Sequence, residues 1–133
     1  MKVIIKTIPH KKQRYETCGD WFRDKKGNLI INVSDMGDDR YAYLVAIHEL
    51  VETLICEHDG IKEKDVTAFD IAFEKKSGPD STDEPGDDPD APYVRQHCIA
   101  TAVERLLAAE IGVKWNHYAD AIDALFTDGA MKS

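Results

Sequence analysis

Residues 41–58 read YAYLVAIHELVETLICEH, an apolar run with a histidine and two glutamates near its middle. Its apolar side chains point in nearly every direction around the 3.6-residue helical period, which predicts a helix packed on most of its sides. Asp35 or Asp38 can cap its start, and Gly60 supplies a permissive position after its end near His58. The run therefore predicts the central helix of the fold.

The rest of the chain predicts an α+β fold, with a small antiparallel sheet of about three strands packed against a helical layer. Asp24 to Gly27 form a polar hairpin connection between the second and third strands. The expected strands are Val3–Ile8, Tyr15–Phe22 and Asn28–Ser34, and the further helices are about Glu63–Lys75, from about Pro92 to Gly112, and about Asn116–Phe126.

Length and composition indicate one domain over residues 1–133, because 133 residues with 43% hydrophobic content suit a single core. Its parts are a sheet region (1–35), the central and second helices (36–76), an acidic loop rich in Pro and Gly (77–92) and the C-terminal helices (93–133). Four of the five prolines fall in this loop, so we expect no regular structure there.

Charge argues against two classes of partner. The formal net charge is -8, and a basic surface for nucleic acid or an anionic membrane is not expected. Residues 78–92 contain six Asp and Glu and no Lys or Arg, so the remainder is nearly neutral. This acidic loop could instead bind a protein partner, although a run of like charges is usually only solvated.

No signal peptide or membrane-spanning run is recognisable, which predicts a soluble, cytoplasmic protein. Cys18, Cys56 and Cys98 are odd in number and lack Cys-x-x-Cys spacing. A disulfide framework or a Cys-only zinc site is therefore not expected, and buried thiols are the simpler interpretation.

The chemistry is concentrated on the central helix. Residues four apart lie about 40° apart around a helix, so His48 and Glu52 share one face and can bind one ion. Glu49 lies at about 100°, where its carboxylate can reach a metal-bound water. Burying these groups without partners would cost several kcal/mol each. The alternative is that both glutamates pair with Lys or Arg and His48 is an ordinary core histidine.

A catalytic zinc commonly has two histidines, one carboxylate and an open position for water. Of the other histidines, His10, His58 and His117 lie in turns or at helix ends and are expected to be exposed. His97 follows the long loop near the start of a helix, and we predict it as the third ligand.

Two further carboxylates are candidates near this site. Asp70 could be a fourth ligand or accept the far N–H of a ligand histidine, and a surface position is equally compatible with the sequence. Glu104 could likewise lie behind a ligand, or pair with a nearby Arg or Lys.

With His48, Glu52 and His97 as ligands, a zinc or other divalent ion would bring the pKa of a bound water near neutrality. Glu49 would take its proton as the water attacks a polarised carbonyl. This chemistry predicts metal-assisted hydrolysis of an unknown peptide or small-molecule substrate.

The runs IHELVETLICEHDGI (47–61), DVTAFDIAFE (65–74) and EPGDDPDAPYVRQHCIATAVERLLAAEIGVKW (84–115) resemble a group of small uncharacterised phage and prophage proteins, over roughly the last two-thirds of the chain. Host cytoplasm is then the expected location. The helix also resembles the active-site helix of zincin metallopeptidases, whose pattern is His-Glu-x-x-His. That resemblance implies His48 as ligand and Glu49 as general base, with Glu52 in place of the second histidine. The strand Asn28–Ser34 would line the cleft.

Other functions remain open at this stage. Glu49, Glu52, Asp70 and Glu104 could form an all-carboxylate magnesium site, as in helical nucleotide pyrophosphohydrolases, although the strands and the central histidine argue against it. His58-Asp59 is a poor match to a His-Asp phosphohydrolase signature because it lies at a helix end. A third possibility is a non-catalytic phage protein with a structural metal or a host-protein-binding role.

Overall fold

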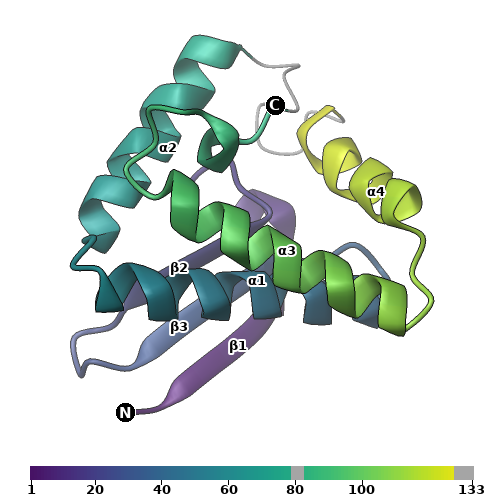
Figure 1. The fold of residues 1–133 in the computed structure, drawn as a ribbon, viewed down its shortest axis with the longest axis horizontal. Coiled ribbons are helices and arrows are strands. Elements are labelled where there is room, and N and C mark those ends of the chain that lie inside the picture. The colour runs from purple at the N-terminus through teal and green to yellow at the C-terminus, as the bar shows by residue number, and fades with distance from the viewer. Residues whose placement is uncertain (79–82, 128–133) are drawn as a thin grey trace.

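The computed structural model describes residues 1–78 and 83–127. A three-stranded sheet packs against one side of helix α1, and helix α3 packs against another (Figure 1). The strands are β1 (Val3–Ile8), β2 (Gly19–Arg23) and β3 (Leu29–Ser34); the helices are α1 (Asp39–His58), α2 (Glu63–Ser77), α3 (Val94–Glu110) and α4 (Trp115–Thr127), with 3-10 turns η1 (His10–Lys12) and η2 (Pro85–Asp87).

The sheet has the order β1-β3-β2, so β3 is central. β2 and β3 form the predicted antiparallel hairpin, whose turn is closed by Asp24 accepting from the backbone N–H of Lys26 and Asn28. β1 instead runs parallel to β3. The α+β class is confirmed, but the expectation of a wholly antiparallel sheet was wrong. The hairpin determines the direction of β2 relative to β3 only. The segment that contains η1 and β2 separates β1 from β3 and is long enough for β3 to run parallel to β1.

β2 is shorter than predicted and lies at an edge of the sheet. The expected strand from Tyr15 begins only at Gly19, because the preceding segment bends and the phenol of Tyr15 bonds to Asp70 on α2. β2 is the edge strand that lies beside Glu49 and Glu52 of α1, whereas β3 lies in the middle of the sheet and lends no residue to the lining of the cleft. The prediction that the strand Asn28–Ser34 lines the cleft was therefore wrong.

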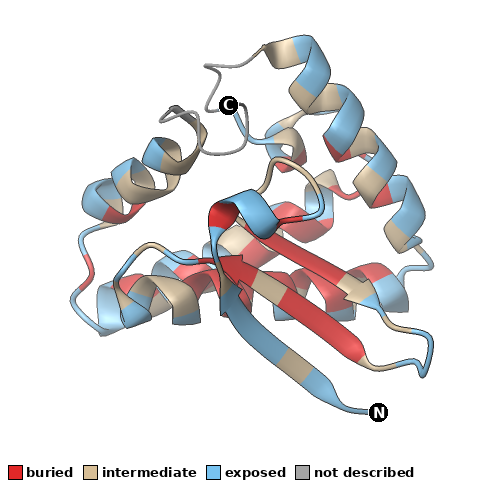
Figure 2. Cartoon of the chain, turned by 180° about the vertical axis from the view of Figure 1, so that it is seen from behind, coloured by how far each residue is buried: buried red, intermediate tan, exposed pale blue. Residues whose placement is uncertain are grey.

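α1 begins and ends where the sequence predicted. The Asp38 side chain caps it by accepting from the backbone N–H of Arg40 at 2.9 Å. The expectation of packing on most sides was wrong for one side, where Tyr43, Leu50 and Leu54 are exposed. The sheet and α3 cover two sides of the helix and leave this one open. Figure 2 shows the buried residues gathered where α1 and β3 meet.

The acidic loop contains more order than expected. Pro85 to Asp87 form the turn η2, which packs against α2 and α3. A proline at the first position of a helical turn is favourable because its missing N–H needs no partner there. Residues 79–82, with Asp80, lie outside the described residues. η2 therefore brings the acidic loop to the start of α3.

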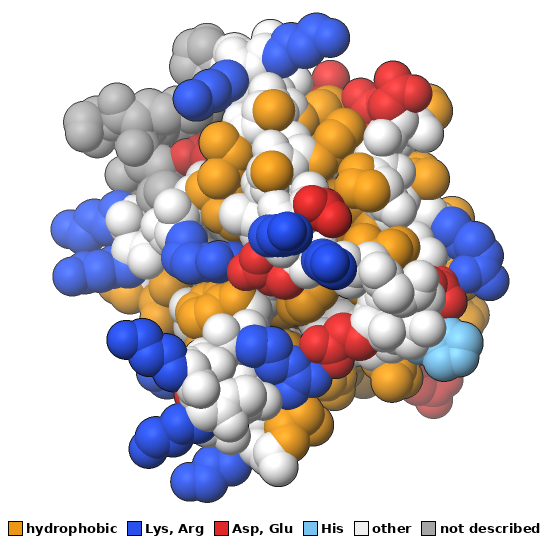
Figure 3. All heavy atoms as spheres, turned by 90° about the vertical axis from the view of Figure 1, so that its left-hand side faces the viewer, with side chains coloured by type: hydrophobic (Ala, Val, Ile, Leu, Met, Phe, Trp, Pro, Cys, Tyr) orange, Lys and Arg blue, Asp and Glu red, His pale blue; other side chains and the backbone are white. Residues whose placement is uncertain are grey.

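The surface carries both signs of charge. On the face in Figure 3, Lys and Arg are interspersed with Asp and Glu. Cys56 is buried and Cys18 half-buried, but Cys98 is exposed, so the expectation of buried thiols was wrong for Cys98. It lies on the outward side of α3. Among the described residues, no helix combines the length and apolarity needed to cross a membrane.

Two neighbouring isoleucines of the sheet test whether the core lies at the central strand β3. Ile31 on β3 is fully buried, and its register partner Ile5 on β1 is 49% exposed. We expect Ile31→Ala to lower the free energy of unfolding by about 2–5 kcal/mol, because it leaves a cavity in the core. Ile5→Ala should cost about 1 kcal/mol or less. Urea unfolding of the metal-free protein measures both, and equal losses would contradict the assignment of the core.

Candidate metal centre

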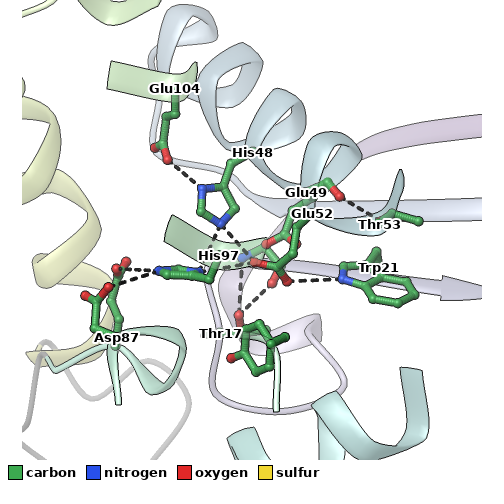
Figure 4. Close-up of polar contacts among 12 residues, drawn as sticks. Thr17, Trp21, His48, Glu49, Glu52, Thr53, Asp87, His97 and Glu104 are labelled. Atoms are coloured by element: carbon green, nitrogen blue, oxygen red, sulfur yellow. Dashed lines mark hydrogen bonds and ion pairs between the residues drawn. The ribbon is translucent and has the colours of Figure 1, made fainter. Parts of the chain in front are cut away.

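Three side chains from two helices converge at one buried point (Figure 4). His48 and Glu52 lie one turn apart on α1, with His48 Nε2 3.1 Å from Glu52 Oε2. His97 on α3 directs Nδ1 to the same point, 3.1 Å from Glu52 Oε2 and 3.2 Å from His48 Nε2. The structure thus brings together the three residues predicted as ligands.

The spacing of these atoms fits a small metal ion. Ligand atoms 2.0–2.2 Å from a tetrahedral zinc ion are separated from one another by about 3.3 Å. The three observed separations are 3.1, 3.1 and 3.2 Å. Two imidazoles with one carboxylate suit zinc better than magnesium, which prefers oxygen ligands. The residues present therefore fit the ion that the sequence predicted.

The orientation of His48 is set from behind by Glu104. His48 Nδ1 lies 2.7 Å from Glu104 Oε1, and because a carboxylate can only accept, Nδ1 carries the proton. In the neutral ring, Nε2 then directs a lone pair at Glu52 Oε2, which is also an acceptor. Two acceptors at this distance need a proton or a cation between them. A carboxylate behind a histidine is the usual way to fix a metal-binding tautomer.

Without a metal, protons fill this role. Burial lowers the pKa of His48, but hydrogen bonds with Glu104 and Glu52 outweigh it and raise the pKa well above its ordinary value. Burial likewise lowers the pKa of His97, while the hydrogen bond to Glu52 and the nearby carboxylate of Glu84 raise it to about 10. Burial raises the pKa of Glu52, but its two histidine partners bring it down to about 2. A divalent cation would replace these protons.

The second carboxylate oxygens of Glu52 and Glu104 also accept hydrogen bonds. Trp21 on β2 donates from Nε1 to Glu52 Oε1 at 3.2 Å, which leaves Oε2 facing the histidines. The fully buried Tyr118 on α4 donates its phenol to Glu104 Oε2 at 2.5 Å. Glu104 thus lies behind His48, a predicted ligand, which is one of the two roles that the sequence left open. α4 contributes to the site through Tyr118.

Glu49 lies beside the cluster, against the edge strand. A Cβ atom at Gly19 would lie 2.5 Å from Glu49 Oε1, so only glycine allows the carboxylate this close to β2. Burial and the negative charge of Glu52 raise the pKa of Glu49 well above its usual value. Such a carboxylate is a stronger base than an exposed one. Glu49 is not among the three clustered ligands.

Asp70 is buried in the same cleft but has other partners than expected. It accepts from the phenol of Tyr15 at 2.8 Å and from the phenol of Tyr93, and burial raises its pKa to about 7. It is neither in the ligand cluster nor bonded to a site histidine. Both predicted roles for Asp70 therefore find no support in the described structure, and its carboxylate is held by the two tyrosines.

The other histidines lie away from the cluster. His58 and His117 are exposed, as predicted. His10 is buried, with Nδ1 2.8 Å from the hydroxyl of Ser34, so the expectation of an exposed His10 was wrong. The turn η1 places it against the end of β3, where that hydroxyl satisfies the ring.

Several residues that shape the site were missed from the sequence. Gly19, Trp21, Gly86 and Tyr118 contact Glu49, Glu52, His97 and Glu104 respectively, mostly across long separations in the chain. One signal was available, because a tryptophan in a buried strand needs an acceptor for its indole N–H. The glycines gave no signal, because their role depends on which elements pack against them.

None of the protein-family models, curated proteins or solved structures compared with the chain matches it. The described residues that line the cleft around the cluster include several carboxylates and no Lys or Arg. This lining favours a cation as the bound species.

The protonation of His97 predicts how stability depends on pH in the metal-free protein. Its pKa is about 10 in the folded protein, against the ordinary histidine value of 6.5 in the unfolded chain. The native state therefore binds more protons between these values, and stability falls as pH rises. This contribution is complete below about pH 6.5 and lost by about pH 10. His48 acts with the same sign.

Urea unfolding of the metal-free protein, kept free of metal by a chelator, measures the free energy of unfolding between about pH 6.5 and pH 10. We expect the free energy of unfolding to decline with pH in the parent, and the decline to be shallower in His97→Ala. The variant His117→Ala, which changes an exposed histidine, should keep the parental slope. Equal slopes in the parent and His97→Ala would contradict the proton assignment.

Proposed function

We propose that the chain is a metal-dependent hydrolase in which His48, Glu52 and His97 hold one divalent ion, with zinc as the first candidate. The observation that carries this proposal is the convergence of His48 Nε2, Glu52 Oε2 and His97 Nδ1 within 3.2 Å of one another, with Glu49 buried beside them. The substrate class is a peptide or another small carbonyl compound.

The different roles of Glu49 and Glu52 follow from the surroundings of each carboxylate. A bound ion would supply Lewis acidity, polarising a carbonyl and lowering the pKa of a water molecule. Glu49 is the group that receives a proton, because its raised pKa favours the protonated form. Glu52 is unsuited to that task, since Trp21 and the two histidines already occupy its oxygens.

The arrangement is similar to a zincin site with one exchange. The second histidine of the His-Glu-x-x-His pattern is replaced by Glu52, and an imidazole from α3 restores a set of two histidines and one carboxylate. The edge strand β2 lines the cleft beside Glu49. A phage origin remains part of this proposal on the basis of the sequence resemblance alone.

A structural metal is the second candidate, and ligand number separates the two. Structural zinc is usually closed by four protein ligands, whereas the cluster in the described structure has three. The two histidines count against a magnesium pyrophosphohydrolase. The three cysteines of the described chain are free, which fits a reducing compartment, and we propose a cytoplasmic location.

A conservative change at Glu49 separates catalysis from metal binding. Glu49→Gln removes the base and none of the three ligands. We therefore expect a zinc content near one per chain when one equivalent of zinc is supplied. Hydrolysis of fluorescein-labelled casein, or of a pool of short fluorogenic peptides, should fall about 100-fold or more. Elemental analysis and the two assays measure both quantities on the same preparation.

The matched control is Glu57→Gln, a glutamate exposed on the same helix that pairs with Arg23. It should retain both zinc and activity. Activity that survives Glu49→Gln, or a parent that binds no zinc after reconstitution, would overturn the proposal. Zinc binding with no hydrolysis in the parent would move the assignment to a structural metal.

A further inference from the structure

The far edge of the His97 ring faces a second group of carboxylates. His97 Nε2 lies 3.4 Å from Glu84 Oε2 and 3.4 Å from Asp87 Oδ1. These three side chains offer ligand atoms that all lie within 4.8 Å of one another. They are distinct from the first cluster except for the ring that both share. In Figure 4, Asp87 lies on the opposite side of His97 from Glu52.

His97 Nε2 is buried, and in the described structure it has only the two 3.4 Å contacts with carboxylate oxygens and no hydrogen bond of good geometry. His97 as a whole is only 7% exposed. Buried polar atoms are nearly always paired, and N–H···O bonds cluster near 2.9–3.0 Å, shorter than the two contacts here. The separation of about 3.3 Å expected for atoms sharing one tetrahedral zinc ion is closer to what is observed.

The turn η2 holds these groups in place. Gly86 lies between the two carboxylates in sequence, and a Cβ atom there would be 2.4 Å from His97 Nδ1. Glycine therefore lets η2 lie directly against the imidazole, with Glu84 and Asp87 on either side in the chain. In this position Nδ1 of the ring faces Glu52 and Nε2 faces the carboxylates of Glu84 and Asp87.

We propose that His97 Nε2, Glu84 and Asp87 bind a second divalent cation, bridged to the first by the His97 ring. Two carboxylates and one imidazole nitrogen suit a borderline ion such as zinc. With Nδ1 on the first ion, the ring keeps one proton on Nε2, and this proton passes to solvent when the second ion binds. The resulting imidazolate donates one lone pair to each ion.

The second site is more open than the first. The side chain of Glu84 is 48% exposed and that of Asp87 68%, whereas the first site is buried. Solvent and salt screen exposed carboxylates, so the second ion binds more weakly and exchanges more readily. This site rests on the proposed function only through the shared ring, and it can form without the first ion.

Titration of the full chain with zinc at constant ionic strength tests the proposal. We expect two ions per chain in the parent, the second at least tenfold weaker than the first. The double variant Glu84→Gln with Asp87→Asn should keep the tight ion and lose the weak one. Asp90→Asn, an exposed aspartate shortly after the same turn, is the matched control and should keep both.

The variant His48→Ala separates this site from the hydrolase site, because it removes a ligand of the first ion alone. It should lose the tight ion and still bind one weak ion. A single ion per chain in the parent at saturating zinc would overturn the second site. So would a weak ion that persists in the double variant, because Glu84 and Asp87 would then have no part in it.

Discussion

The structure depends on one unfavourable requirement, the burial of several ionisable groups at the contact between α1 and α3. His48, Glu49, Glu52, His97 and Glu104 are all at most 9% exposed in a chain of 133 residues. Removing one partner from such a group costs several kcal/mol, because the charge left behind has no compensation. The arrangement is stable only if the acceptor atoms that face one another share a proton or a cation. A divalent ion at the point of convergence would bind one atom each of His48, Glu52 and His97.

Each layer of the fold supplies something to this point. The edge strand β2 brings the indole of Trp21 to Glu52 and the small surface of Gly19 to Glu49. α3 brings both His97 and Glu104, and α4 brings the phenol that holds Glu104. The site is therefore assembled from elements distant in the sequence, and packing at each contact fixes an orientation that α1 alone could not.

Local spacing was enough to predict α1, two candidates for its cap of which Asp38 is the one observed, and the shared face of His48 and Glu52. His97 could be predicted because a ligand set needs a third member and the other histidines lay in turns or at helix ends. Contacts that depend on long-range packing could not be predicted from local sequence. Nothing local to β1 indicates that it pairs parallel to β3, and nothing near His10 indicates the hydroxyl of Ser34 that lets it be buried.

Anomalous scattering at the zinc edge, from crystals of the zinc-loaded protein, would test the central claim most directly. The account predicts a strong peak about 2.0–2.2 Å from His48 Nε2, Glu52 Oε2 and His97 Nδ1. It also predicts that Glu49 is not bonded to the ion. Zinc bound only elsewhere, with these three atoms keeping their present contacts, would contradict the proposed site, because protons alone would then explain the cluster.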